Sequence, residues 1–196
     1  MSDMGVQSAE ARRVVVGITG ASGAAYGIRV LELLQPLAEV ETHLVISGAA
    51  RTTIDVETDM SRSEVEALAD HVHGVRDIGA AISSGSYTTS GMIVAPCSIK
   101  SLSAITNSFS ADLIGRAADV TLKERRPLVL MVRETPLHLG HLQLMARVTE
   151  MGAVVYPPVP AFYNEPQSIA DIVTHTAGRS LEHLGIMVDD VKRWTG

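Results

Sequence analysis

The chain is 196 residues long, 46% hydrophobic and 19% charged. This is the composition of one compact domain, and it excludes a disordered or low-complexity protein. The net charge of −6 makes sequence-independent nucleic-acid binding a poor fit, because such binding needs a basic surface. A single cysteine, Cys97, excludes an internal disulfide framework and a cysteine-rich zinc site, and it fits a reducing compartment.

The N-terminal segment is polar. Residues 1–12 contain no apolar central stretch, so we expect a disordered tail rather than a secretory signal, followed by one domain over residues 13–196. No apolar run reaches the length of a membrane span. We therefore expect a cytoplasmic protein.

Short β-branched runs alternate with longer runs of helical periodicity. Continuous apolar runs are typical of strands buried on both faces. The alternation predicts a three-layer α/β domain with a parallel sheet and helices on both faces. The expected strands are Arg13–Ile18, Val40–Ile46, Gly91–Ala95, Pro127–Val132 and Gly152–Tyr156.

Five helices are expected between and after these strands. The first covers Ala24–Leu37, and the second follows a capping-box pattern from Ser61 to Glu64 and carries Val72 on its apolar face. Thr135 and Pro136 are predicted as the N-cap and first residue of the fourth helix, and the last starts near Ser168. The third is predicted as one continuous helix through Leu102, Ile105, Phe109, Leu113 and Ala117.

Ligands of parallel sheets bind at the carboxyl ends of the strands. The first strand ends in the Gly-Ala-Ser-Gly loop at 20–23, whose backbone suits a phosphate or a flavin edge at a helix N-terminus. A tight turn without a ligand is an equal reading, and the ending of a Walker loop is absent. After the second strand, Ser47 offers a hydroxyl, whereas Glu57 is expected on a solvated charged face.

The third strand ends in Pro-Cys-Ser-Ile-Lys-Ser at 96–101. A helix N-terminus with two hydroxyls and an ammonium group suits an anion. Cys97 is a candidate nucleophile, but a buried structural cysteine is the favoured reading because no helper residue is placed beside it.

The fourth strand is followed by Arg133 and Glu134. The arginine is a candidate phosphate ligand and the glutamate a candidate for proton transfer, unless the two merely neutralise each other. His138 and His141 have metal-like spacing, but ordinary helix-surface histidines are favoured because no companion ligand motif is present.

Further candidates lie outside the strand ends. Lys123 belongs to a charge run near Arg116 that is usually just solvated, and Tyr163 is as well explained by packing as by phosphate binding with Arg179. Together, the glycine loop and the cations indicate a phosphate-containing ligand but no particular reaction. The cations meant are Lys100, Lys123, Arg133 and Arg179.

Several long motifs in order resemble the UbiX family of flavin prenyltransferases, formerly described as aromatic-acid decarboxylase subunits. The resemblance runs from about Val14 to Trp194. Its motifs are GITGASG at 17–23, PCSIK at 96–100, AADVTLKERRPLVL at 117–130, RETPLH at 133–138 and PPVPAFY at 157–163. Two departures are mild: Gly48 stands where members often have lysine, and Ser101 where they have threonine.

The resemblance implies a Rossmann-like or flavodoxin-like domain that binds FMN. It implies transfer of a dimethylallyl group from dimethylallyl phosphate to N5 and then C6 of reduced FMN, without a metal. The product, prenylated FMN, would pass to UbiD-type decarboxylases. The assembly would be a homo-oligomer, typically a dodecamer, with active sites between subunits.

The resemblance also assigns site residues by position. Ser22, Glu57, Lys123 and Glu134 would be catalytic, with Glu134 protonating the departing phosphate or acting as a base in ring closure, and Ser22 relaying protons at N5. FMN would contact Gly20, Ala21, Ser22, Ser47, Ser98, Ile99, Lys100, Ser101 and Arg133. The prenyl donor would contact Arg116, Lys123, Arg133, Glu134, Tyr163 and Arg179.

Two other functions compete with this one. A flavoprotein that decarboxylates a cysteine-type substrate would share the glycine loop and FMN, but the expected Asn/Met-rich substrate motif is missing. A non-catalytic FMN-binding subunit or carrier of an aromatic acid decarboxylase would need the FMN contacts and none of the donor contacts.

Overall fold

The computed structural model describes residues 11–189 and residue 191. The expected tail therefore lies almost entirely outside the described residues. Its last residue, Arg12, already belongs to the first strand, and its guanidinium donates hydrogen bonds to the carbonyls of Leu184 (2.7 Å) and Gly185 (3.0 Å). No described helix has the length and apolarity that crossing a membrane requires.

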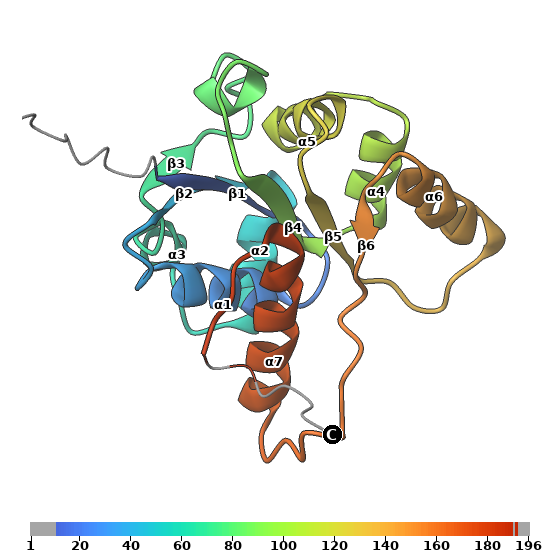
Figure 1. Cartoon of the computed structure of the whole chain (residues 1–196). Coiled ribbons are helices and arrows are strands. Elements are labelled where there is room, and N and C mark those ends of the chain that lie inside the picture. Colours follow the sequence, from blue (N-terminus) through green and yellow to red (C-terminus); the bar gives the residue numbers. More distant parts are fainter. Residues whose placement is uncertain (1–10, 190, 192–196) are drawn as a thin grey trace, which may run out of the picture.

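Six parallel strands form one sheet in the order β3-β2-β1-β4-β5-β6, which is the strand order of Rossmann-like doubly wound sheets (Figure 1). The order reverses between β1 and β4, so the fold's usual ligand crevice lies at the carboxyl ends of these two strands. The strands are β1 Arg12–Ile18, β2 Val40–Ile46, β3 His71–His73, β4 Gly91–Cys97, β5 Leu128–Val132 and β6 Val154–Val155.

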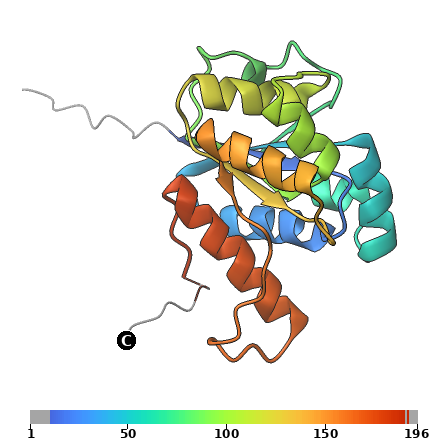
Figure 2. The same cartoon turned by 90° about the vertical axis from the view of Figure 1, so that its right-hand side faces the viewer.

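The helices cover both faces of the sheet, which confirms the predicted three-layer domain. In both views α1 and α7 lie on one face, and α4, α5 and α6 lie on the other (Figures 1 and 2). The helices are α1 Ala24–Leu34, α2 Gly48–Glu57, α3 Arg62–Glu66, α4 Ile99–Thr106, α5 Leu113–Lys123, α6 Leu139–Glu150 and α7 Ile169–Leu181.

Two apolar clusters fill the spaces between the layers. Alternate residues of β1 enter different clusters: Val14 and Val16 pack with α1 and α7, whereas Val15 faces the α4–α5 side. All three are at most 1% exposed. A strand buried on both faces explains why the sequence shows continuous apolar runs rather than alternation.

The prediction of one continuous helix through Phe109 is wrong. The chain leaves the helical path after α4, where Ser108 has a φ of 51°. A second helix then begins after its N-cap Asp112, whose side chain accepts a hydrogen bond from the Gly115 N–H (2.9 Å). Phe109 lies in this break and is 66% exposed, so its helical spacing was coincidental.

The prediction that Val72 lies on a helix is also wrong. The capping box at Ser61 and Glu64 is confirmed, but α3 is a short helix that ends before Ala67. Val72 instead lies in β3, an edge strand that pairs with β2. Three residues are too few to give a periodic signal in the sequence, so this strand is recognised only by its pairing with β2 in the structure.

Two helix starts also differ from expectation. The helix α2 was not predicted, because only Ala50 and Ile54 of its residues are buried and its apolar stripe is therefore short. The helix α6 begins after His138, whose Nδ1 accepts a hydrogen bond from the Gly140 N–H (3.0 Å), and not at Thr135. The start of α7 after Ser168 is confirmed, with a capping box to Asp171.

Candidate functional site

The loops that follow β1, β2, β4 and β5 meet at one edge of the sheet. Backbone hydrogen bonds connect them: Ser47 N–H donates to the Ile18 carbonyl (2.9 Å), Thr19 N–H to the Pro96 carbonyl (3.2 Å), and Arg133 N–H to the Cys97 carbonyl (3.1 Å). Strand ends that are distant in sequence are thereby held as one rigid rim around the crevice.

The glycine loop lies tightly against the start of α2. A Cβ placed on Gly20 would lie 3.3 Å from the Ala49 carbonyl carbon and closer still to the Ala49 side chain. Gly23 has a φ of 103°, a left-handed conformation that favours glycine, and it precedes α1 without a capping side chain of its own. The loop therefore needs small residues to keep its approach to α2.

Glu57, at the end of α2, caps the start of α1 in place of the missing side chain. Its carboxylate accepts hydrogen bonds from the Gly23 N–H (2.7 Å) and the Ala24 N–H (3.0 Å). Burial opposes its ionisation, but hydrogen bonds from the Ser22 side chain and from these two N–H groups, together with the charge of Arg133, outweigh burial and lower the pKa of Glu57. Glu57 is exposed, as expected, but its carboxylate also caps a neighbouring helix, which the expectation of a merely solvated face did not include.

A cavity of about 510 Å³ lies next to this loop. Ser47 and Ser98, the N-caps of α2 and α4, both border it, so the N-termini of two helices face the same space. A second cavity of about 560 Å³ continues along α4 and α5 and shares Lys100, Ser101, Ala111 and Asp112 with the first. The first cavity is lined by Gly20, Ser47, Ala49, Val75, Arg76, Ser98, Lys100, Ser101, Ala111 and Asp112, among others.

The Ser98 turn is organised by hydroxyl groups. Ser98 Oγ accepts a hydrogen bond from the Ser101 N–H (3.2 Å) and lies 3.1 Å from Ser101 Oγ. Cys97, one residue earlier, is fully buried, and burial raises the pKa of its thiol to about 12. The thiolate is therefore not formed near neutral pH, which confirms the structural reading of this cysteine.

Arg133 and Glu134 follow β5 at the same rim and are exposed. The Arg133 charge reaches Glu57, as described above, and also Tyr26, where it opposes a rise in pKa caused by burial. Glu134 accepts a hydrogen bond from the Thr135 N–H (3.0 Å). Among the described residues, no hydrogen bond or ion pair joins its carboxylate to the Arg133 guanidinium. The two side chains therefore do not simply neutralise each other.

The predicted site residues on α5, Arg116 and Lys123, lie away from the crevice. From Leu113, next to the cavity-lining Asp112, to Lys123 the helix rises by about 15 Å, so Lys123 stands near the opposite edge of the sheet from Glu134. There Lys123 pairs with Glu124. Arg116, two turns earlier, donates to the Ser83 carbonyl (3.1 Å) and pairs with Asp119 (3.2 Å).

Tyr163 and Arg179 form a third group, beside α7. Tyr163 is 56% exposed and lies on the long connection from β6 to α7, which projects away from the sheet (Figures 1 and 2). Burial raises the pKa of Tyr156, the Arg179 charge opposes this, and Glu182 and Tyr163 add to it. Arg179 and Tyr163 therefore share Tyr156 as a near neighbour, and Arg179 also pairs with Glu182.

One chain thus brings together only part of the predicted set. The crevice gathers Ser22, Glu57 and Arg133 with the Ser47 and Ser98 turns, and Ala21 and Ile99 belong to the same two loops. Within a single chain, the α5 group and the α7 group remain apart from it.

Two charged residues of the first cavity, Arg76 and Asp112, were missed by the sequence analysis. Arg76 follows β3 just as the other site residues follow their strands, so the strand-end rule finds it once β3 is recognised. Asp112 was hidden inside the expected continuous helix. The rings of the metal-like pair His138 and His141 lie with their centroids 3.6 Å apart and their planes tilted by 31°, and His138 serves as the N-cap of α6.

The hydrogen bonds between Glu57 and the start of α1 should stabilise the folded protein in a pH-dependent way. Glu57→Gln should lower the free energy of unfolding by about 0.5–1 kcal/mol at pH 7, because a neutral amide caps the helix dipole less well. The folded-state pKa lies below the unfolded value of about 4.3, so the carboxylate stabilises above that value and its contribution disappears as pH falls through the folded pKa. Melting temperatures of both proteins at pH 7 and at about pH 3 test this. A gap that persists unchanged at the lower pH contradicts it.

Known proteins are similar to this chain in sequence and in fold. The model of the Flavoprotein family matches residues 5–180. The flavin prenyltransferase UbiX of Escherichia coli strain K12 is 57% identical over 187 residues, which cover 94% of this chain and 99% of that protein.

Two solved structures are similarly close. The crystal structure of AnUbiX (PadA1) in complex with FMN and dimethylallyl pyrophosphate has a TM-score of 0.93 and 53% identity, covering 95% of this chain and 99% of that one. A dodecameric FMN-dependent UbiX-like decarboxylase from Escherichia coli O157:H7 has a TM-score of 0.92 and 48% identity, covering 94% and 100%. The chain belongs to the Flavoprotein family and, within it, to the UbiX flavin prenyltransferases.

Proposed function

We propose that this protein joins the dimethylallyl group of dimethylallyl phosphate to N5 and C6 of reduced FMN, releasing phosphate and forming prenylated FMN. The observation that carries the proposal is the crevice at the β1–β4 switch point, where the glycine loop, two serine-capped helix N-termini and Arg133 converge. The likeness to a structure that holds FMN and dimethylallyl pyrophosphate supports it.

The FMN phosphate is best accommodated at the N-terminus of α4. The start of α1, the usual phosphate position of a Rossmann-like sheet, already holds the Glu57 carboxylate. At α4, the Ser98 and Ser101 hydroxyls, the Lys100 ammonium and the first N–H groups of the helix border one cavity. This donor set suits a phosphate dianion.

Ser22 and Glu57 form a proton path at the glycine loop. Bound reduced FMN supplies the nucleophilic N5 and C6 atoms. Ser22 donates a hydrogen bond to Glu57, which is kept ionised by its other hydrogen bonds, so the hydroxyl can pass a proton on to a base already in contact with it.

Charged groups must stabilise the departing phosphate. When the allylic carbon–oxygen bond breaks, negative charge grows on the leaving oxygen, and the cations of the donor set would neutralise it while Glu134 supplies a proton. Arg133 and Glu134 directly follow β5, whose carboxyl end lies at the rim of the crevice, whereas in one chain Lys123 pairs with Glu124 and Arg179 with Glu182. We therefore infer that neighbouring subunits bring Arg116, Lys123, Tyr163 and Arg179 to the crevice of another chain.

The surface supports assembly into a homo-oligomer, and a dodecamer is the state of one similar structure. Neighbouring subunits would exclude water from the allylic group and would cover large apolar side chains that one chain leaves exposed. They include Val56, Ile78, Phe109, Leu139, Leu142, Val159, Phe162, Ile169 and Met187, each at least 50% exposed.

The family resemblance extends the proposal to the product. Prenylated FMN would be delivered to a UbiD-type decarboxylase in the cytoplasm. A non-catalytic FMN carrier would need none of the residues that contact the prenyl donor. It would bind FMN without changing its mass, which distinguishes it from the enzyme.

The proposal is tested by anaerobic incubation of the protein with reduced FMN and either dimethylallyl phosphate or dimethylallyl diphosphate. Mass spectrometry of the extracted flavin should show FMN heavier by one prenyl unit. FMN that stays tightly bound but unchanged with both donors would support the carrier reading instead.

A further inference from the structure

Four polar side chains gather on one face of the sheet edge formed by β2 and β3. Glu41 and His43 are two residues apart on β2, and His71 and His73 are two residues apart on β3, so each pair points to a single face. In the register, His43 is opposite His71, and Val45 is opposite His73. Parallel pairing therefore places both pairs on the same side.

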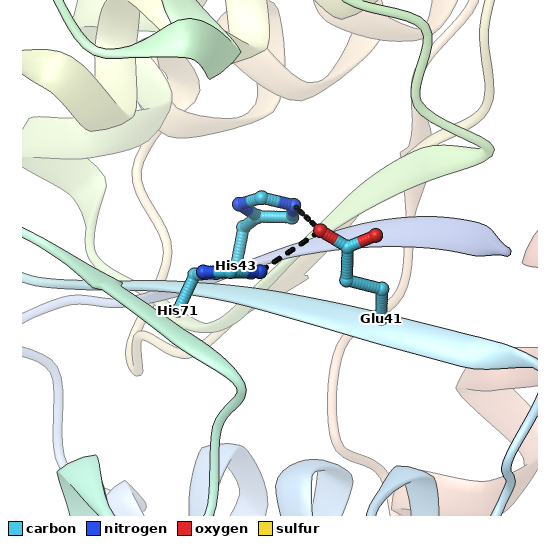
Figure 3. Close-up of side chains that lie close together, drawn as sticks. All are labelled: Glu41, His43 and His71. Carbon is cyan, nitrogen blue, oxygen red and sulfur yellow. Dashed lines mark ion pairs between the residues drawn. The ribbon is translucent and has the colours of Figure 1, made fainter.

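Three ligand atoms of this group converge (Figure 3). Glu41 Oε1 lies 3.3 Å from His43 Nε2 and 2.9 Å from His71 Nε2. All the ligand atoms of the three residues lie within 4.8 Å of one another. Bonds of about 2.0–2.2 Å from a tetrahedral zinc ion separate its ligand atoms by roughly 3.3 Å, so only a small rotation of His71 is needed to complete the set.

The surrounding groups orient these ligands. His43 is 2% exposed, and its Nδ1 lies 3.0 Å from His73 Nε2, so a proton on Nδ1 leaves Nε2 for a metal. Arg13 Nε binds the other oxygen of Glu41 at 3.3 Å. The Tyr87 hydroxyl lies 3.1 Å from His43 Nε2 and also bonds Glu41, so it must turn from this nitrogen toward Glu41 or a bound water when the ion takes its place.

We propose that Glu41, His43 and His71 bind one Zn²⁺ ion, with water as the fourth ligand next to Tyr87. Two imidazoles and a carboxylate are a zinc donor set, and His43 and Glu41 each have a neighbour that fixes their orientation. No role in prenyl transfer is involved, since these residues lie along the strand before Ser47, roughly 13 Å from His43 to the crevice edge.

The ion would clamp the edge of the sheet. The strand β3 has only three residues and pairs with β2 alone. One Zn²⁺ held from both strands crosslinks them, and Tyr87 connects the loop that follows β3 to the same point. Binding should therefore stabilise the folded chain, because the converged ligand set exists only in the folded state.

The test is titration of metal-stripped protein with Zn²⁺ alone, in competition with a chromophoric chelator. We expect one ion per chain and a rise in melting temperature. His71→Ala should weaken Zn²⁺ binding by at least about 100-fold, as should Glu41→Gln. His71 is 52% exposed, so its removal leaves the fold intact, which retained FMN binding by the variant verifies.

His183→Ala is the matched control, because His183 is also exposed but contacts only the Tyr156 ring among the described aromatic side chains. It should bind Zn²⁺ as the unaltered protein does. No stoichiometric binding by the unaltered protein overturns the proposal. Binding that survives in both His71→Ala and Glu41→Gln overturns it equally, since the ion would then sit elsewhere.

Discussion

Glu134→Gln should lower the rate of flavin prenylation by at least about 100-fold while FMN remains bound. The Glu134 carboxylate accepts a hydrogen bond from the Thr135 N–H at 3.0 Å, and the amide oxygen of glutamine can accept the same bond. The loop after β5 therefore keeps its shape. What the substitution removes is a group able to give or take a proton beside the departing phosphate.

The measurement is the rate at which the mass of the bound flavin increases, together with an FMN titration. Glu150→Gln, at the exposed end of α6, is the control for loss of one carboxylate and should react at the normal rate. A Glu134→Gln protein that prenylates FMN normally contradicts the catalytic role. Loss of FMN binding would instead place Glu134 in the flavin site.

Gly20→Ala should weaken FMN binding by at least about tenfold and destabilise the fold by about 1–3 kcal/mol. The new Cβ would collide with Ala49 in the first turn of α2, and part of that obstacle is backbone, which cannot rotate away. Relief requires the glycine loop and α2 to separate. Both elements border the cavity assigned to FMN, so its shape changes directly.

Gly48→Ala is the matched control for this substitution. Gly48 is the neighbour of Ala49 and borders the same cavity, but a Cβ at Gly48 meets no described atom within 4 Å. The variant should keep its stability and should lose less FMN affinity than Gly20→Ala. FMN titrations and melting curves of both variants decide the matter: equal behaviour of the two would show that the contact between Gly20 and Ala49 does not shape the site.

Much of the fold could be predicted from the sequence because its strands are buried on both faces. Val14, Val15 and Val16 give a continuous apolar run that only a central strand explains. Elements at the edge of the sheet lack this signal. The strand β3 is three residues long with an exposed face, and α2 buries only two side chains, so neither produced a pattern.

The site was predictable where residues directly follow strands. Ser47, Ser98 and Arg133 follow β2, β4 and β5, and the fold brings these strand ends together. The role of Glu57 was not predictable, since nothing local to α2 reveals that its last residue caps α1. Sequence also gives no distance between Lys123 and the crevice, which depends on the direction in which α5 runs.

The central claim is that catalytic groups from different subunits complete each crevice. It is tested most directly by assembling mixed oligomers of Lys123→Ala and Glu134→Gln subunits, each inactive on its own. If one chain supplies Glu134 and another Lys123, random mixing gives half of the sites an intact glutamate and half of those an intact lysine. About a quarter of the normal prenylation rate should then return. Mixed oligomers no more active than their parents would contradict the account.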